Sequence, residues 1–250
     1  MSQNSSTLAD QKVTPYNDID TKREQVENMF DNIAPYYDLL NRVLSLGIDK
    51  RWRSQAISLL NDLESPKILD VATGTCDVAL EMAKKLNAPS IVGLDISAKM
   101  LEVGQKKIDK AGYGQIISLQ QGESENLPFD DNTFDAITVA FGVRKYDNLQ
   151  QGLKEMYRVL KPDGQLVVLE FSRPTMFPFK QGFNFYFKNI LPRIGKLTSK
   201  DPKAYQYLYE SVQAFPDGDD FVKILDTLGY KKSTCTALTV GICSIYHSRK

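Results

Sequence analysis

The sequence predicts a doubly wound, mostly parallel α/β sheet of seven strands that ends in an antiparallel hairpin. From residue 66 onward, short runs rich in Val, Ile and Leu alternate with amphipathic segments, the pattern of strands joined by crossover helices. The strand candidates are apolar on both faces, which is typical of a parallel sheet covered by helices. The last two candidates are too close in sequence for a parallel crossover, so we expect them to pair antiparallel.

The composition is that of one globular domain, which we place at residues 21–250, with no surplus of charge. The chain has 250 residues, enough for one sizeable core, and its 31 Lys and Arg balance 31 Asp and Glu. A nucleic-acid-binding protein usually carries a basic surplus, so no nucleic-acid partner is expected. Cys76, Cys235 and Cys243 lack the spacing of zinc ligands and suggest a reducing compartment. With His247 as the single histidine, histidine triads and histidine metal sites are excluded, and we expect no metal.

The N-terminal region predicts a polar tail followed by a helical cover. Residues 1–20 are polar and are expected to be disordered. Three helices should follow between residues 22 and 63: Pro35 should start the second, Gly47 should end it, and Asp49 can cap the third. The apolar stripe of the first helix consists of Val26, Met29, Phe30 and Ile33, and that of the third contains Trp52, Ile57, Leu59 and Leu60.

The remaining elements alternate along the chain. Five strands are expected at KILDVA, SIVGLDI, QIISLQQ, FDAITVAF and GQLVVLEFS, which begin at residues 67, 90, 115, 134 and 164. Helices are expected between them near 77–87, 97–111 and 147–160. An irregular stretch at 173–216, a helix near 217–228 and strands near 230–238 and 241–248 complete the domain.

The loop after the first strand is the candidate ligand site, because ligands of open α/β sheets bind at the carboxyl ends of the strands. Asp70 precedes this loop, which contains Gly74, and Asp95 follows Gly74 at a spacing of about 20 residues. An acidic residue at that spacing accepts hydrogen bonds from a ribose diol. The alternative is that each carboxylate only caps a local turn or helix.

The same loop argues against a dinucleotide. Cys76 and Ala79 stand where a dinucleotide fingerprint needs glycines. The negative charge of Asp70 near the reactive end of the ligand suits a cation better than a phosphate. A ligand with a ribose, an ammonium and a sulfonium satisfies both conditions, and S-adenosylmethionine is such a ligand.

Two longer motifs identify a family. The stretches YDLLNRVLSLGIDKRW (37–52) and RVLKPDGQLVVLEFS (158–172) resemble the two signatures of the ubiquinone/menaquinone biosynthesis C-methyltransferases, a class I, Rossmann-like family, and the similarity extends over about 22–250. The resemblance implies methyl transfer from S-adenosylmethionine to a ring carbon of a prenylated quinol. It favours conversion of demethylmenaquinol to menaquinol, because the VATGT loop is similar to that of menaquinone-making relatives; benzoquinol methylation on the ubiquinone route is the alternative.

The resemblance also implies cofactor-binding positions. Thr75 and Asp95 match the family's loop and ribose positions, and Gly122 and Glu123 match the pair that flanks the adenine. Gly74 and Asp70 complete the expected set. The chain departs from the family at several positions: Ala140 replaces a serine, Cys76 a glycine or alanine, Asp49 a histidine and Lys145 an asparagine.

Catalysis requires an activated acceptor ring. A phenolic hydroxyl has a pKa near ~10, so a carboxylate, a water or a cation must favour its anion. Arg144 follows the fourth strand and stays protonated, so we assign it to stabilising the oxyanion or ordering a water; a surface ion pair is the alternative. Tyr37 can close over the ring or simply pack, and Asp38 and Asn41 can serve the helix surface.

The stretch 171–216 is aromatic and basic. It holds 11 of the chain's 25 aromatic residues, with seven Lys or Arg and two acidic residues. We expect a substrate lid over 173–216, and two arrangements stand equally. The lid lies on an anionic membrane surface, or it is a helix that packs Phe183, Phe187 and Ile190 on the sheet. No run approaches the ~20 apolar residues of a membrane span. A cytoplasmic protein is expected, with contact to the inner face of the membrane and a homodimer as open alternatives.

Two other functions agree with part of the sequence. A nicotinamide-dependent reductase would need the missing glycines and would not end in a hairpin. A non-catalytic cofactor-binding partner in a quinone-synthesis complex fits the departures at Cys76 and Ala140, but it does not explain Asp70, Asp95 and Arg144.

Overall fold

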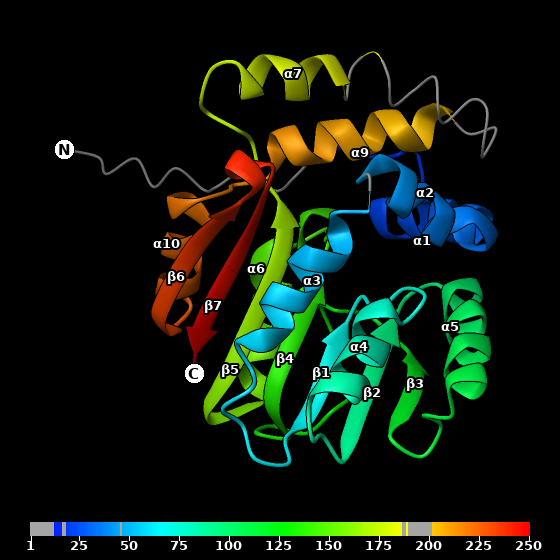
Figure 1. Cartoon of the computed structure of the whole chain (residues 1–250), viewed down its shortest axis with the longest axis vertical. Coiled ribbons are helices and arrows are strands. Elements are labelled where there is room, and N and C mark those ends of the chain that lie inside the picture. Colours follow the sequence, from blue (N-terminus) through cyan, green and yellow to red (C-terminus); the bar gives the residue numbers. More distant parts are fainter. Residues whose placement is uncertain (1–12, 17–18, 46, 187–188, 190–201) are drawn as a thin grey trace.

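The computed structural model describes residues 13–16, 19–45, 47–186, 189 and 202–250. A seven-stranded sheet runs through the middle of the molecule in the order β3-β2-β1-β4-β5-β7-β6 (Figure 1). The strands from β1 to β5 pair in parallel. β7 pairs antiparallel with both β5 and β6. The predicted mostly parallel sheet with a terminal hairpin is therefore confirmed.

The strands lie where the sequence predicts them. The parallel strands are β1 (Lys67–Val71), β2 (Ser90–Asp95), β3 (Ile117–Gln121), β4 (Phe134–Ala140) and β5 (Leu160–Phe171), and the hairpin strands are β6 (Lys231–Leu238) and β7 (Cys243–Arg249). β5 is longer than expected because it begins four residues before GQLVVLEFS. His247 is an ordinary strand residue whose Nε2 lies 2.7 Å from the Gln165 side-chain oxygen.

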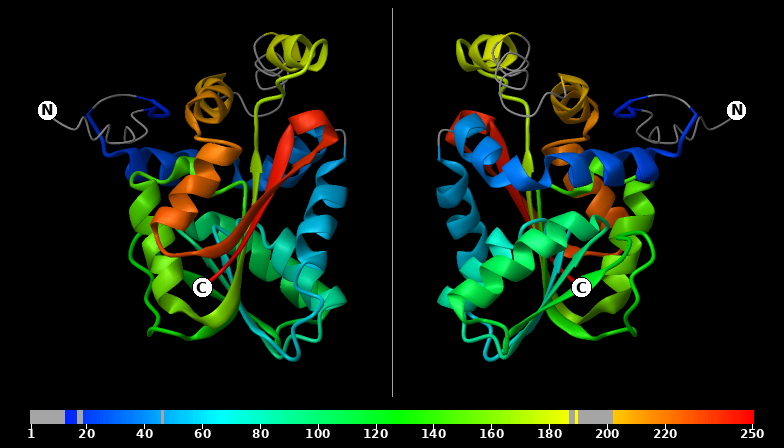
Figure 2. Two further views of the ribbon diagram at one scale, coloured as in Figure 1. Left: turned by 90° about the vertical axis from the view of Figure 1, so that its left-hand side faces the viewer. Right: turned by 90° about the vertical axis from the view of Figure 1, so that its right-hand side faces the viewer.

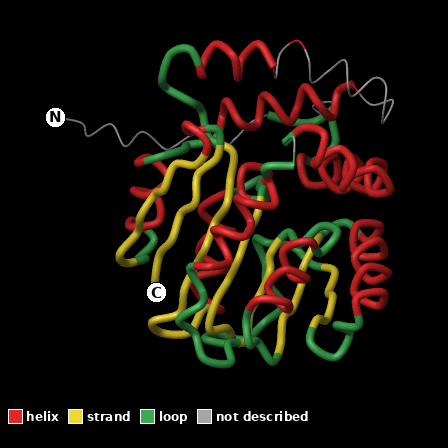
Figure 3. The backbone as a smooth tube through the Cα atoms, in the orientation of Figure 1, coloured by secondary structure: helices red, strands yellow, loops and turns green. Residues whose placement is uncertain are grey.

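Helices cover both faces of the sheet (Figures 2 and 3). One face packs against α3 (Asp49–Ser58), α4 (Asp77–Lys85) and α5 (Ala98–Ala111), and the other against α6 (Leu149–Val159) and α10 (Asp219–Thr227). Ile57 and Met82 on the first face and Phe221 on the second are fully buried. Apolar side chains on both faces therefore bury the sheet, which explains why its strands read as continuous apolar runs.

The N-terminal helices lie over the carboxyl ends of the strands. They are α1 (Lys22–Ile33), the 3-10 turn η1 (Ala34–Tyr36) and α2 (Tyr37–Leu44). Thr21 and Glu24 form a capping box that begins α1, and the predicted stripe of this helix is buried. Pro35 lies in η1, so a 3-10 turn precedes α2. Gly47 follows the end of α2 with φ +76°, which favours glycine.

One prediction about the stretch before the last helix needs correction. The stretch 173–216 is not irregular throughout, since it contains α7 (Phe179–Phe185) and α9 (Pro202–Ala214). Phe183 of the predicted lid helix is buried, whereas Phe187 and Ile190 lie outside the described residues. Residues 1–12 and 17–18 of the predicted tail also lie outside them.

Candidate active site

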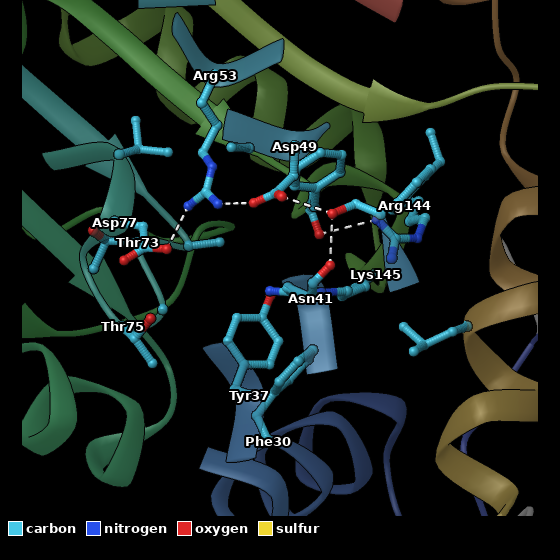
Figure 4. A pocket seen from close by; sticks show the side chains of 18 of the residues that line it. Phe30, Tyr37, Asn41, Asp49, Arg53, Thr73, Thr75, Asp77, Arg144 and Lys145 are labelled. Atoms are coloured by element: carbon cyan, nitrogen blue, oxygen red, sulfur yellow. Dashed lines mark hydrogen bonds and ion pairs between the residues drawn. The ribbon is translucent and has the colours of Figure 1, made fainter. Parts of the chain in front are cut away.

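Two adjacent cavities lie at the carboxyl ends of the strands. We call the first the Asp95 cavity; it has a volume of about 450 Å³, within the roughly 300–1,000 Å³ of small-molecule sites. Its lining includes Glu24, Asp95, Met100, Glu123 and Asp147. We call the second the Arg144 cavity; its lining includes Asn41, Asp49, Asp70, Thr73, Arg144 and Val212. Figure 4 shows this second cavity, with loop residues on one side and Arg144 and Lys145 on the other.

The loop between β1 and α4 has the tight backbone that its sequence suggests. Ala72, Gly74 and Cys76 all have positive φ, between 55° and 65°. The positive φ at Gly74 favours glycine, and a side-chain carbon there would make an ordinary contact with the Tyr37 ring at 3.8 Å. Left-handed conformations at non-glycine positions are held by their surroundings, and Cys76 is fully buried. The loop is therefore a fixed wall, and Gly74 lines both cavities.

Asp95 is held by backbone donors at the end of β2. Its Oδ2 accepts the Gly74 N–H at 2.8 Å, and its Oδ1 accepts the Ser97 N–H at 2.9 Å. Burial raises the pKa of Asp95, and these backbone hydrogen bonds act against that rise. The carboxylate is thus fixed between the loop and the start of α5 while it faces the Asp95 cavity.

Asp70 occupies a different environment. Its two carboxylate oxygens accept hydrogen bonds from the Thr73 and Thr138 hydroxyls, both at 2.6 Å. Burial is the largest effect on this carboxyl and raises its pKa to about 6, although the two hydroxyls lower it. Asp70 lines the Arg144 cavity and Asp95 lines the other. The two acids therefore lie in neighbouring cavities that meet at Gly74.

Thr75 belongs to a charged network that joins four helices. Its hydroxyl donates to Asp38, and the Lys107 ammonium contacts both Asp38, at 2.8 Å, and Asp77. Lys107 and Arg53 lower the pKa of Asp77 against the effect of burial. Asp38 was expected to serve the helix surface; its carboxylate instead contacts Thr75 and Lys107 and so fixes the loop to α2.

Asp49 is the other end of this network and does not cap α3. The N-cap residue is Ile48, which makes no side-chain capping bond. Asp49 instead accepts a hydrogen bond from the Ser45 hydroxyl at 2.6 Å and pairs with Arg53, one helical turn later. Arg53 also reaches Asp77 at 2.6 Å. The predicted cap is wrong because the nearby guanidinium is a better partner for a buried carboxylate than a backbone N–H.

Arg144 lies in the 3-10 turn η2 (Val143–Lys145) after β4. It is 2 % exposed and pairs with Glu170 of β5, which is fully buried. Its Nη1 also donates to the Phe141 carbonyl at 3.1 Å, and its Nε donates to the Ser211 hydroxyl at 3.3 Å. Its Nη2 makes no hydrogen bond within the described part of the chain. Arg144 is therefore a fixed cation beside the cavity, and the alternative of a surface ion pair is wrong.

Tyr37 begins α2 and lines both cavities. Its ring meets that of Phe30 edge to face, with centroids 5.9 Å apart. Burial raises the pKa of Tyr37, while a hydrogen bond with the Asn41 side chain acts in the opposite direction. Tyr37 is thus a neutral aromatic wall between the cavities, and its direct role in catalysis stays a prediction.

The residues after β3 divide between two tasks. Glu123 lines the Asp95 cavity and pairs with Arg23 of α1 at 2.8 Å. Gly122 lines neither cavity; its N–H donates to the Asp95 carbonyl at 3.0 Å. A side-chain carbon at Gly122 would lie 2.9 Å from the end of the Leu94 side chain, so a larger residue would force that side chain to move.

The fold brings to the cavities several residues for which the sequence predicted no catalytic or binding role. Lys145 lines both, and Leu208 and Val212 of α9 close the Arg144 cavity. Arg53 had an available signal, since it stands four residues after Asp49 on one helix. Among the described residues, no group of three His, Cys, Asp or Glu side chains is arranged to hold a metal ion.

Known structures share this fold. A SAM-dependent methyltransferase of Thermotoga maritima, described as a possible histamine N-methyltransferase, superposes with a TM-score of 0.64 at 16% identity and covers 90% of this chain and 99% of its own. A SAM-dependent methyltransferase of Aquifex aeolicus gives a TM-score of 0.58 at 17% identity, with 79% and 88% covered. At these identities the likeness is one of fold.

Sequence relatives are much closer. The demethylmenaquinone methyltransferase of Bacteroides fragilis is 47% identical over 240 residues, which cover 96% of this chain and 98% of that protein. The ubiquinone/menaquinone biosynthesis C-methyltransferase UbiE of Geotalea daltonii is also 47% identical, with 92% and 97% covered. Residues 18–250 match the ubiE/COQ5 methyltransferase family, which confirms the resemblance seen in the two signatures. The chain therefore belongs to the ubiE/COQ5 methyltransferase family.

Proposed function

We propose that this enzyme transfers a methyl group from S-adenosylmethionine to a ring carbon of a prenylated naphthoquinol, converting demethylmenaquinol to menaquinol. The observation that carries the proposal is the 47% identity, over almost the whole length of both chains, with a protein named demethylmenaquinone methyltransferase. A relative named for both quinones is also 47% identical. Methylation of a benzoquinol on the ubiquinone route is therefore the second candidate.

The residues of the Asp95 cavity fit S-adenosylmethionine. Asp95 is an acceptor whose position two backbone N–H groups fix, as a ribose diol requires. Glu123 lies farther along the same cavity, where it can accept from the adenosine end. Gly74 would form part of the floor. Thr75 and Asp70 line the neighbouring Arg144 cavity, where Asp70 would lie near the positively charged end of the cofactor. Bound there, S-adenosylmethionine supplies an electrophilic methyl group on a sulfonium that leaves as a neutral thioether.

The Arg144 cavity fits an aromatic ring that carries an acidic hydroxyl. Phe141, Phe171 and Val212 supply apolar walls. Arg144 supplies a cation that cannot lose its proton and that Glu170 holds in one place. A fixed cation favours the phenolate without reorganising during the reaction, and Tyr37 holds the ring in line for transfer.

Helix α7 supports contact with a membrane surface at its cytoplasmic side. Four large apolar side chains at and before this helix are exposed: Met176 by 62%, Phe177 by 79%, Phe179 by 43% and Phe185 by 61%. Lys180 lies among them, whereas the charge of Arg173 is partly neutralised by Asp217 at 3.0 Å. None of the described helices is both long and apolar enough to cross a membrane. We infer a peripheral lid that inserts these side chains where a polyprenyl tail dissolves.

Vesicle flotation tests the membrane proposal. The enzyme should float with vesicles that contain anionic lipid at low salt. The double variant Phe177→Ser/Phe185→Ser should stay at the bottom, and the control Val240→Ser, which alters an exposed side chain in the hairpin turn, should float. Absence of flotation by the parent would exclude the peripheral lid. Sedimentation of the same protein decides between a monomer and a homodimer.

A methyl-transfer assay tests the function itself. The purified enzyme should move labelled methyl from S-adenosylmethionine to a short-tailed demethylnaphthoquinol, and the product should carry one additional methyl on a ring carbon. A short-tailed benzoquinol with an unsubstituted ring carbon, assayed beside it, should react at least tenfold more slowly. Equal or faster reaction of the benzoquinol would favour the ubiquinone route. If the protein binds the cofactor but methylates neither quinol, it would instead be a non-catalytic partner in a quinone-synthesis complex.

A further inference from the structure

The wall shared by the two cavities is short. Seven residues line both of them: Phe30, Tyr37, Ala72, Gly74, Ala140, Phe141 and Lys145. A methyl group that passes from one cavity to the other has to cross this wall. Only Tyr37 and Lys145 among the seven carry side chains that exchange protons. The carboxylates that line the Arg144 cavity are already engaged, since Asp49 and Asp77 pair with Arg53 and Asp70 accepts two threonine hydroxyls. Tyr37 and Lys145 are therefore the candidates for the group that takes a proton from the acceptor ring.

Lys145 has the setting of a base. It follows Arg144 in the η2 turn, is only partly exposed, and its Nζ lies 4.1 Å from the centre of the Phe30 ring. Within the part of the chain that the structure describes, no carboxylate forms an ion pair with this amine. A lysine without a carboxylate partner can exist as the neutral amine, which accepts a proton.

The surrounding charges favour the neutral amine. Burial, the largest effect, and then the Arg144 guanidinium lower the pKa of Lys145 to about 7, against Glu170 and Asp95, which raise it. Tyr37, across the cavity, stays protonated because burial raises its pKa. The Phe30 ring face attracts the ammonium form and limits how far the pKa can fall. The pKa values of the two groups thus move apart: the Tyr37 hydroxyl stays neutral, and the Lys145 amine titrates near neutrality.

We propose that Lys145 is the general base of the methyl transfer, an inference that rests on the proposed function. The neutral Nζ accepts the proton of the acceptor's ring hydroxyl, and Arg144 stabilises the phenolate oxygen. The ring carbon then forms a bond to the methyl carbon, whose bond to sulfur breaks with the electron pair remaining on sulfur. The same ring carbon loses its hydrogen to water, so the phenolate forms again and recovers a proton from the Lys145 ammonium. One proton is released in each turnover.

Arg144 and Lys145 thereby divide the work of activating the ring. Arg144 is held by Glu170, Phe141 and Ser211 and stays charged, so it cannot take the proton. Lys145 has no such anchor and can change its charge in each cycle. Both are catalytic residues under this proposal, with separate tests.

Amine labelling tests the proposal without turnover. The protein free of acceptor is acetylated briefly between about pH 5 and pH 10, and modification of each lysine is followed by mass spectrometry. The reactivity of Lys145 should reach half its maximum at about pH 7, whereas exposed Lys154 serves as the internal comparison at higher pH. A midpoint for Lys145 above about pH 9 would overturn the proposal.

Variants test the role in turnover. Lys145→Met should lower kcat about a hundredfold or more while the Kd for S-adenosylmethionine and the KM for the quinol stay within about threefold. Lys145→Arg should be equally slow because its guanidinium stays protonated and cannot accept a proton. The rise of kcat through about pH 7 should vanish in both, and a small primary amine should partly restore Lys145→Ala. Lys154→Met is the matched control.

The two proposals can fail separately. Turnover of Lys145→Met within threefold of the parent, with the same pH profile, would overturn the role of Lys145 and leave the proposed function intact. If the parent enzyme binds S-adenosylmethionine but methylates no quinol, the proposed function is wrong, and so is the proposed role of Lys145 as its base.

Discussion

Two regions form opposite sides of the same cavities by different means. One is the sheet edge, by which we mean the carboxyl ends of the strands and the loops that follow them, and the other is the helical cover of α1, α2 and α9. On the sheet edge, polar groups are fixed at short range: two backbone N–H groups hold Asp95, and two threonine hydroxyls hold Asp70. On the cover, α1, α2 and α9 contribute mainly rings and aliphatic side chains, such as Phe30, Tyr37 and Val212. The edge is therefore built to fix charges, and the cover is built to exclude water.

This difference suggests how the two ligands are selected. The cofactor meets a wall whose atoms are set by strand ends and tight backbone turns, which leaves little freedom to accept another ligand. The acceptor meets side chains from helices that are far apart in sequence, so single substitutions can change the shape of its site. Specificity for the quinol should therefore reside in the cover, and chemistry should reside in the edge.

The largest effect is expected when the partner of Arg144, the fixed cation of the sheet edge, is removed. Glu170→Gln leaves Arg144 buried without its carboxylate, and we expect a loss of about 3–5 kcal/mol in the free energy of unfolding, together with loss of turnover. Asp131→Asn is the matched control, because Asp131 pairs with Arg158 at the surface and is 68% exposed; it should cost at most about 1 kcal/mol. Urea unfolding measures both. Equal losses would mean that the buried pair contributes no more than a surface pair.

A second substitution tests the cofactor wall. Asp95→Asn can accept only one of the two backbone N–H groups and loses the charge that grips a ribose diol. We expect affinity for S-adenosylmethionine to fall roughly ten- to a hundredfold, as measured by calorimetry. Asp109→Asn, at the exposed far end of α5, should bind like the parent. If Asp95→Asn also binds like the parent, the ribose does not lie against β2.

The third substitution, Asp70→Asn, should affect the stability of the fold and the affinity for the cofactor in opposite directions. Because burial raises the pKa of Asp70 to about 6, the folded protein holds this proton more tightly than the unfolded chain, whose carboxyl has a pKa near 3.8. The stability that Asp70 contributes is thus full below about pH 3.8 and is lost as the pH rises through about 6. Asp70→Asn avoids that loss and should be more stable than the parent by roughly 1–3 kcal/mol at pH 8.

The advantage of Asp70→Asn should shrink at pH 5, and affinity for the positively charged cofactor should fall about tenfold at pH 8. Thermal unfolding of both proteins at the two pH values checks the first expectation, and calorimetry checks the second. A variant that is less stable than the parent at pH 8 would show that Asp70 is needed for the fold in its ionised form.

The smallest effect is expected in the cover. Tyr37→Phe keeps the edge-to-face contact with Phe30 and removes only a hydroxyl, so kcat should stay within about threefold of the parent. Tyr37→Ala removes the ring and should lower kcat at least tenfold through loss of positioning. Steady-state assays of the pair sharpen the comparison, since a large loss in Tyr37→Phe would assign the hydroxyl to the chemistry.

The sheet was predictable because its signals are local. Continuous apolar runs marked the strands, and the short gap before β7 marked the hairpin. Helix α9 was missed because its buried face carries Tyr207 and Ser211 beside Val212. A serine on that face interrupts the apolar stripe by which a helix is recognised.

The site was predictable where spacing carries the information. Asp95 and Gly74 lie at the expected separation and are joined by a hydrogen bond. The setting of Lys145 was not predictable, since it depends on Phe30 from the distant helix α1 and on burial that only the folded chain creates. The same holds for Glu170, which contacts Arg144 only after β4 and β5 pair.

The beginning of α1 couples uptake of the cofactor to the docking of that helix. The buried Lys22 amine donates to the Tyr146 carbonyl at 2.7 Å, and Thr21, Arg23 and Glu24 line the Asp95 cavity. A small molecule held between this helix and the strands binds only the docked arrangement, so a concentration a hundredfold above its Kd stabilises that arrangement by about 2.7 kcal/mol. The first helix should then resist proteases and exchange its amide hydrogens far more slowly in the loaded enzyme than in the empty one.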